Sequence, residues 1–369
     1  PSSASLQNVN GYDGTMRARP FAVNDKMYFL TDTDENEDTG EPETAILFEL
    51  SINRATQNDA AEALNTARPN IISGEILDVA VYGAEYTAMY AILGTNKIVS
   101  HVFRFAEGQR AQNAFNQQFI AESFTICAIS FDGSRFYVHY TDEAGDMFLG
   151  TIQMARLSKG LGTYSNMYQD GQCLLTHPEV ISSYDGVTDR TTIVMPYQVS
   201  SSDAPKFEAI AVGETTDNDF DIAEGSIADK DGDIEGDTFR LIGDWTNSKL
   251  ALGIVGPRCS WIPPEPTARD RNGAPDYSST YQISHLGLKV KNSGHAQMWI
   301  DGQSLGSFSG LRLDDGVSSY ESPISYSGSF QITVAESSEG LLMEIGSDHH
   351  LPLTINGFHW YGIKNSRAF

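Results

Sequence analysis

The stretch YQISHLGLKVK, residues 281–291, decides the fold class of this chain. Apolar residues take every other position from Leu286 to Val290, and lysines lie beside them at 289 and 291. Successive side chains of a β-strand point to opposite faces, so this alternation predicts a strand with one buried face. Short runs of the same kind, rich in β-branched and aromatic residues and bounded by Gly, Asn and Asp, recur along the chain and predict an all-β fold.

The predicted strands fall on both sides of an acidic segment, residues 216–237. Before it they cover 26–30, 45–50, 76–83, 98–105, 124–131 and 135–141, and after it 238–243, 249–256, 281–291, 296–302, 328–335, 341–346 and 353–362. In SFDGSRFYVHY (130–140), Asp132-Gly133 lies between two strand runs and predicts a hairpin, and AVNDKMYF (22–29) predicts another. Helical patterns are few: residues 56–67 predict one short helix, and 105–122 predict a second helix or a long loop.

Strand pairs begin near residues 19, 77, 124 and 191, a spacing close to that of four-stranded propeller blades. We therefore expect a propeller-like β domain at 1–215, which is incomplete if the blades do not close. The alternative is an irregular β-sandwich with large loops. The acidic segment 216–237 is expected to be a linker or loop, and the strands at 238–369 predict a C-terminal β-sandwich. A second acidic stretch, 31–43, is expected to be a solvated loop.

The net charge narrows the classes of partner. Among 369 residues, 49 are Asp or Glu and 24 are Lys or Arg, a formal charge of −25. Such a chain repels DNA and anionic membranes, which argues against specific nucleic-acid recognition. The most apolar stretch, 78–94, is too short to span a bilayer and contains Glu85, so no membrane anchor is expected. Residues 1–20 lack the apolar core of a signal peptide, and because the chain starts at Pro1 we expect a segment to precede it.

Three cysteines, 127, 173 and 259, lie far apart without a CxxC pair, which excludes a zinc ribbon and favours buried free thiols, with one disulfide as the alternative. In DKDGDIEGDTFR (229–240), Asp229, Asp231 and Asp233 match an EF-hand loop at its first positions. Ile234 stands where that loop needs Gly, and Arg240 where it needs Glu. A solvated loop is the better interpretation, and the three aspartates are only weak candidates for a metal.

The segment HHLPLTINGFHWYGIKNSRAF, 349–369, is apolar and aromatic and ends in cations. Neighbouring residues on a strand point to opposite faces, so His349 and His350 are not expected to share a metal. Aromatic residues such as Trp299 and Trp360 favour core or inter-subunit packing over a sugar platform. No nucleophile elbow, Walker loop or dinucleotide fingerprint is present, since GSFSG (306–310) has Phe308 where the elbow needs Ser. We therefore predict no catalytic residues, no enzyme activity and no cofactor.

Several segments together resemble one family, the tail nozzle or tail tubular protein B of T7-like short-tailed bacteriophages. They are the strand Gly253–Trp261, the turn RDRNG with Arg269, Asp270, Asn272 and Gly273, the run TYQISHLGLKVKNSGHAQMWI (280–300), the ending LMEIGSDHHLPLTINGFHWYGIKNSRAF (342–369) and the beginning SASLQNVNGYDGTMRARPFAVNDKMYFL (3–30). The match is strongest after Gly236. The family's usual Gly-Arg before the long strand is Ser279-Thr280 here, and family members are typically about twice as long.

The resemblance implies a structural protein of the virion tail. A nozzle of this kind is a homo-hexameric tube that binds an adaptor, tail tubular protein A, carries tail fibres at its side, and gates and conducts double-stranded DNA during genome ejection. In such a tube an acidic lumen would repel passing DNA. We expect Trp299, Trp360, Tyr361, Lys364 and Arg367 to contribute to assembly. The alternative is a receptor- or glycan-binding tail β-protein without catalysis, and a propeller hydrolase is a third class.

Overall fold

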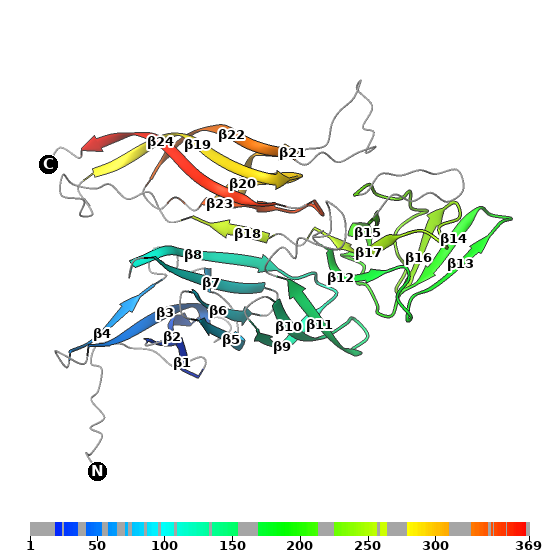
Figure 1. Cartoon of the computed structure of the whole chain (residues 1–369), viewed down its shortest axis with the longest axis horizontal. Helices are drawn as coiled ribbons and strands as arrows, with labels where there is room; N and C mark the ends of the chain where they lie inside the picture. The colour runs from blue at the N-terminus through cyan, green and yellow to red at the C-terminus, as the bar shows by residue number, and fades with distance from the viewer. Residues whose placement is uncertain are drawn as a thin grey trace, which may run out of the picture.

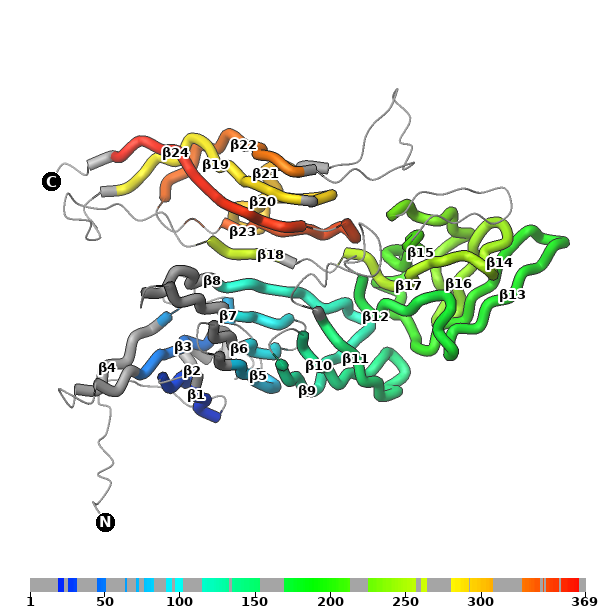
Figure 2. The backbone as a smooth tube through the Cα atoms, viewed as in Figure 1, coloured from blue at the N-terminus to red at the C-terminus, as the bar shows by residue number. Residues whose placement is uncertain are grey.

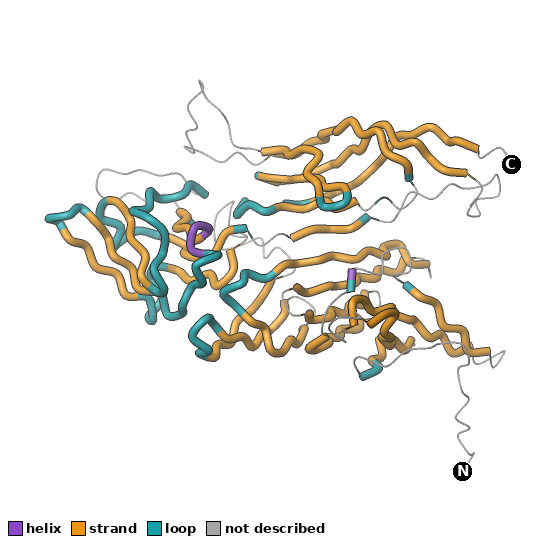
Figure 3. The backbone as a smooth tube through the Cα atoms, turned by 180° about the vertical axis from the view of Figure 1, so that it is seen from behind, coloured by secondary structure: helices purple, strands orange, loops and turns teal. Residues whose placement is uncertain are grey.

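The computed structural model describes residues 19–23, 26–35, 42–53, 58–64, 71–72, 76–84, 87–94, 97–106, 109–132, 135–153, 169–212, 225–256, 259–263, 279–309, 326–338, 341, 343–351 and 353–366. In these residues the named elements are antiparallel strands and the 3-10 turn η2 (Ala204–Lys206) (Figures 1 and 3). The all-β prediction is confirmed. No helix in this part of the chain is long and apolar enough to cross a membrane.

The first sheet is a meander in the order β1-β2-β3-β4. Its strands are β1 (Phe21–Val23), β2 (Lys26–Glu35), β3 (Pro42–Asn53) and β4 (Asn58–Ala63). The predicted hairpin at 22–29 is confirmed, because Val23 pairs with Lys26. The strands β2 and β3 extend into the acidic stretch 31–43, and residues 36–41 of that stretch lie outside the described residues. The helix predicted at 56–67 is wrong, because β4 pairs along β3 and tertiary pairing overrides the helical propensity of its alanines.

The largest sheet has eight strands and joins distant parts of the chain. It contains β5 (Ile76–Ala84), β6 (Thr87–Gly94), β7 (Lys97–Ala106), β8 (Gln109–Phe119), β18 (Cys259–Ile262), β20 (His295–Ile300), β21 (Gln303–Ser309) and β23 (Met343–Ser347), in the order β21-β20-β23-β18-β8-β7-β6-β5. The joint is β18, where Ser260 pairs with Gln117 on one side and with Gly346 on the other. The helix or loop predicted at 105–122 is wrong, because β8 forms ladders with both of its neighbours.

The apolar stretch 78–94 becomes the hairpin β5–β6, which is buried on both faces. Ala91 and Leu93 pack into one hydrophobic cluster, while Ile92 between them packs into another. A strand that is covered on both faces reads as a continuous apolar run instead of an alternating one. This explains why the stretch is the most apolar part of the chain.

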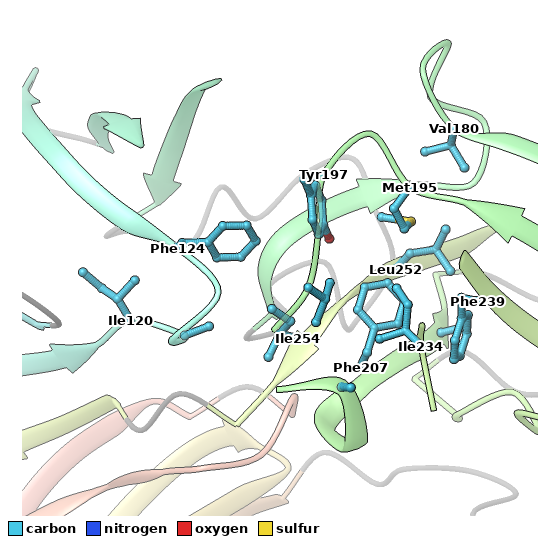
Figure 4. Packing of buried hydrophobic residues seen from close by; sticks show 14 of the residues in the cluster. Ile120, Phe124, Val180, Met195, Tyr197, Phe207, Ile234, Phe239, Leu252 and Ile254 are labelled. Atoms are coloured by element: carbon cyan, nitrogen blue, oxygen red, sulfur yellow. The ribbon is translucent and has the colours of Figure 1, made fainter. Parts of the chain in front are cut away.

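The middle of the chain forms three small sheets around one core (Figures 1 and 2). Their strands are β9 (Thr125–Phe131), β10 (Arg135–Thr141) and β11 (Met147–Gln153); β12 (Gln169–Leu174), β17 (Leu250–Val255) and β15 (Phe207–Ala211); and β13 (Ile181–Asp185), β14 (Arg190–Val194) and β16 (Thr238–Ile242). The hairpin predicted at 130–140 is confirmed by the pairing of β9 with β10. Phe207 and Phe239, with ring centroids 4.9 Å apart, lie in this core together with Tyr197 and Leu252 (Figure 4).

The C-terminal part is a two-layered sandwich. One layer is the sheet β22-β19-β24, formed by β22 (Tyr326–Ser337), β19 (Ser279–Ser293) and β24 (Ile355–Ser366). The other layer is the β18, β23, β20 and β21 part of the large sheet. Leu286, Leu288 and Val290 of the opening stretch pack there against Met298 and Ile345.

The predicted repeat matches three strand starts, since β1, β5 and β9 begin at residues 21, 76 and 125 and each begins an antiparallel meander. The sheets in the described residues are open. The second meander, β5–β8, is not a separate blade, because β8 also pairs with β18. The division into domains at 216–237 stays a prediction. Pairing across that segment, β14 with β16 and β15 with β17, places strands from its two sides in common sheets.

Candidate functional site

The residues expected to make assembly contacts occupy different environments. Trp299, on β20, is 5% exposed. Trp360 points into the sandwich core, where its ring centroid lies 4.8 Å from that of Tyr281. Tyr361 points the other way and is 56% exposed, and Lys364 is exposed further along β24. Of these four, Tyr361 and Lys364 are the residues with exposed side chains.

Other predicted positions lie outside the described residues. These are Arg367 and the turn residues Arg269, Asp270, Asn272 and Gly273. Residues 216–224 of the acidic segment 216–237 fall there as well. The assignment of these residues to assembly contacts, a turn and a solvated loop stays a prediction.

Tyr361 belongs to the outer face of the β22–β19–β24 sheet, the side that points away from the sandwich core. His359 lies beside it in an edge-to-face arrangement, with ring centroids 5.4 Å apart. The imidazole of His359 also lies directly over Gly287 on β19, where a Cβ atom would collide with it. Ile363, 69% exposed, continues this row along β24. Sequence reasoning missed Ile363, although its alternation with Trp360 and Lys364 along a strand marks it as outward-facing.

The weak metal candidates lie in a loop that packs on β16. Asp231 forms an ion pair of 2.8 Å with Arg190, and Asp233 lies 3.4 Å from Lys230. The backbone carbonyl of Asp229 accepts a hydrogen bond from the Ile242 amide. Over the described ranges, no group of three or more His, Cys, Asp or Glu side chains is placed to hold a metal ion. Two of these carboxylates are therefore engaged with cations of the protein itself.

His349 and His350 form a stack with His295. The ring centroids of His349 lie 5.3 Å from His295 and 4.2 Å from His350. Burial, together with the two other imidazoles, lowers the pKa of His349 to about 3. Burial lowers the pKa of His350 to about 4 against the opposing effect of its hydrogen bond to Gly225, and burial also lowers the pKa of His295. The adjacent histidines are thus neutral packing groups near neutral pH.

A buried carboxylate holds the connection between β8 and β9. Asp203 is 1% exposed and its Oδ2 accepts hydrogen bonds of 2.8 Å from the amide and the hydroxyl of Ser123. Its Oδ1 lies 3.2 Å from Nζ of Lys206. Asp170 acts nearby, where its Oδ2 accepts a hydrogen bond from the Ala121 amide, and burial raises its pKa to about 6. Both carboxylates fix backbone, which is a structural role.

The cysteines are not all buried. Cys127 is a free thiol at the surface of β9, so the expectation of burial is wrong for this residue, since its side chain points to the outer face of that sheet. Cys173 is a half-buried free thiol, and burial raises its pKa to about 11. A thiol with so high a pKa is unreactive as a nucleophile at neutral pH.

The described residues thus form packed strands, with neutral buried histidines and with carboxylates that accept hydrogen bonds from the backbone. The family that the chain matches is one of structural proteins, in agreement with these contacts. The model of the family described as bacteriophage nozzle protein matches residues 1–368. A comparison with curated proteins gave no significant match. The resemblance found in the sequence is thereby confirmed over nearly the whole chain, which is a structural component of the phage virion tail and belongs to the bacteriophage nozzle protein family.

Proposed function

We propose that this chain forms the homo-hexameric nozzle of a phage tail, which gates and conducts the genome during ejection and has no catalytic activity. The observation that carries the proposal is the family match over residues 1–368. We further propose that the ring binds an adaptor-type tubular protein above it and tail fibres at its side. Double-stranded DNA then passes through the lumen without sequence-specific contacts.

The charge of the chain supports a conduit. Six copies with a formal charge of −25 would carry −150 in total. DNA is repelled by a surface of its own sign, so an acidic wall keeps the passing duplex from adhering. The acidic segments 31–43 and 216–237 are the candidates for this wall.

The edge strands of the sheets also support assembly into a ring. The strands β11, β13, β22 and β24 are edges of their sheets, and exposed edges are hazards that proteins cover by further contacts. Assembly into a closed ring covers such edges against neighbouring copies.

The symmetry of the particle tests the proposal. Electron cryo-microscopy of isolated tails, with this chain located by a tag at an exposed turn such as 143–145, is expected to show six copies around the tail axis. Three-fold symmetry would instead indicate a receptor-binding fibre, and an ordered basic lumen would overturn the proposed role of the charge.

A further inference from the structure

The hairpin β13–β14, residues 181–194, has a tip that is fixed by its own polar groups. The Val187 amide donates to Oδ1 of Asp185 at 2.9 Å, and the hydroxyl of Thr188 donates to Oδ2 of the same carboxylate at 2.9 Å. The hydroxyl of Tyr184 donates to Oδ1 of Asp189 at 2.9 Å. A tip held in one conformation loses little entropy on binding, which favours a contact role.

This hairpin buries Ile193 in the core but exposes three other apolar side chains. Val187, at the tip, is 94% exposed and Ile181 is 65% exposed, with Tyr184 between them at 40%. Single exposed apolar residues are ordinary, but Val187 is almost fully exposed at the tip of a projecting hairpin, where a partner surface can reach it. Among the described strands, β13 is also an edge of its sheet.

The charge of the hairpin tip is negative. Asp185 and Asp189 flank Val187, and hydrogen bonds from Val187 and Thr188 lower the pKa of Asp185, so this carboxylate is ionised. The one cation of the hairpin, Arg190, is engaged in the ion pair with Asp231. An apolar side chain surrounded by carboxylates therefore forms the end of the hairpin.

The outer face of the β22–β19–β24 sheet has the complementary character. Four rows of paired residues cross it, and none of their members is acidic: Ser337–Gln282–Ile363, Thr333–His285–Tyr361, Gln331–Gly287–His359 and Ser329–Lys289–Gly357. Lys289 and Lys291 of β19 belong to this face, and the three strands together contain a single carboxylate, Glu336. In a chain with a formal charge of −25, this face is the cationic and apolar exception.

The two surfaces lie far apart in one molecule. The hairpin projects at one end of the long axis, whereas β24 runs toward the opposite end (Figures 1 and 2). One chain cannot bring them together, but two copies placed head to tail can. Contacts between two different patches are heterologous, and such contacts generate a closed ring when the rotation between successive copies closes.

We infer that the β13–β14 hairpin of one copy docks on the outer face of the β22–β19–β24 sheet of the next copy. Val187 packs against Tyr361 and Ile363, while Asp185 and Asp189 face the lysine side of that surface. The inference rests on the proposed ring and adds which surfaces form its subunit contact.

Disulfide trapping tests the contact in assembled protein. In a Cys127→Ser background, which removes the exposed thiol, a chain carrying both Val187→Cys and Ile363→Cys is expected to form a ladder of covalent oligomers up to six under mild oxidation. Chains carrying either cysteine alone are expected to remain uncross-linked. Val187→Cys with Leu149→Cys is the matched control, because Leu149 is 78% exposed on β11, outside the proposed contact.

Different results of this experiment would contradict the proposed subunit contact and the proposed nozzle function on which it rests. A six-membered ring without the 187–363 ladder would overturn the inference and leave the nozzle role intact. Absence of a ring in the unmodified protein would overturn the nozzle role itself. Cross-linking by Val187→Cys alone would indicate a symmetric pair of hairpins and contradict the head-to-tail contact. Binding of a duplex DNA probe that Lys289→Glu/Lys291→Glu abolishes, without the ladder, would assign the face to DNA instead.

A second measurement guards against misfolding. Val187→Asp and Ile363→Asp are each expected to weaken assembly roughly tenfold or more, as for residues at the centre of an interface. Both side chains are exposed, so thermal unfolding of the unassembled chain should be unchanged. Weakened assembly by Leu149→Asp to the same degree would contradict the assignment.

Discussion

The Nε2 atom of His350 lies 3.0 Å from the carbonyl oxygen of Gly225, 125 residues earlier in the chain. His350 follows β23 of the C-terminal sandwich, whereas Gly225 lies between β15 and β16 of the middle sheets. The ring is 1% exposed, and its Nδ1 has no hydrogen-bond partner in the described residues. One neutral imidazole thus joins two parts of the protein.

Lowering the pH is expected to weaken the contact between His350 and Gly225. The folded-state pKa of His350, about 4, lies below its ordinary value of 6.5, so the unfolded chain takes up the proton first as the pH falls. The stability that depends on the neutral ring is complete above pH 6.5 and declines between pH 6.5 and 4, by about 3 kcal/mol at most. Urea unfolding at several pH values should show a smaller decline for His350→Gln than for the unmodified chain. His177→Gln, at an exposed site, serves as the control, and an equal decline in all three proteins would contradict the prediction.

Replacing Asp170 by Asn should stabilise the protein at alkaline pH. Burial raises the pKa of Asp170 from 3.8 to about 6, so ionising it in the folded state costs stability that is lost as the pH rises through 6. The amide oxygen of Asn can still accept the hydrogen bond from Ala121. We expect a gain of about 1–3 kcal/mol at pH 8 and little change at pH 4, measured by urea unfolding. A loss of stability at pH 8 would show that the charge itself is needed there.

Replacing Asp203 by Asn should have the opposite effect. This carboxylate accepts two hydrogen bonds from Ser123 and lies 3.2 Å from Nζ of Lys206. Removing its charge weakens the charge-assisted hydrogen bonds, and an amide nitrogen turned toward them leaves a donor unsatisfied. A loss of about 2–3 kcal/mol is expected in the same unfolding experiment. If Asp203→Asn and Asp170→Asn shifted stability in the same direction at pH 8, the assigned roles would be wrong.

Substitutions of the neighbouring residues Trp360 and Tyr361 should have different effects, the first on folding stability and the second on assembly. Trp360→Ala removes a ring that packs on Tyr281 in the core and should destabilise the chain by about 3 kcal/mol. Tyr361→Ala removes an exposed ring and should leave the melting temperature of the unassembled chain nearly unchanged, while weakening assembly. Thermal unfolding and analytical ultracentrifugation measure the two effects. Normal assembly of Tyr361→Ala would argue against the outer face as a contact.

Replacing Ser260 by proline should make the C-terminal sandwich unfold separately from the strands β5–β8. Ser260 lies in β18 with partners on both sides, and proline in a central strand removes a ladder hydrogen bond. We expect a loss of about 3 kcal/mol or more and a second transition in thermal unfolding. Proline in place of Ser182, on the edge strand β13, is the matched control and should cost less. A single transition for Ser260→Pro would show that the two parts unfold together without this ladder.

Local sequence patterns predicted the strands well where one face is buried. The alternation at 281–291 became β19, and Leu286 and Leu288 lie on its core side as the alternation requires. The predictions failed where distant pairing determines the structure. The residues of β8 have a polar, helix-like composition, and only the ladders with β7 and β18 hold them extended. No local pattern predicts that a four-residue strand at 259–262 connects both parts of the chain.

The candidate surface was only partly predictable. Aromatic residues near the C-terminus were expected to be at a contact, but alternation along β24 places Trp360 inside and Tyr361 outside, and this depends on which face of the strand is covered. The hairpin tip at Val187 was not singled out, because a valine in a short turn has no signature of its own. Val187 is a candidate contact residue because its side chain is exposed, and this exposure is known only from the folded structure.

The single strand β18 also determines how the protein bears load. A pull between the C-terminal sandwich and the strands β5–β8 loads the ladders of these four residues, which pair the two parts within one sheet. A force along the strand direction strains all of these hydrogen bonds at once, whereas a force across it breaks them one after another. If the chain forms the proposed nozzle, the orientation of β18 relative to the tail axis sets how well these ladders resist the force of genome ejection.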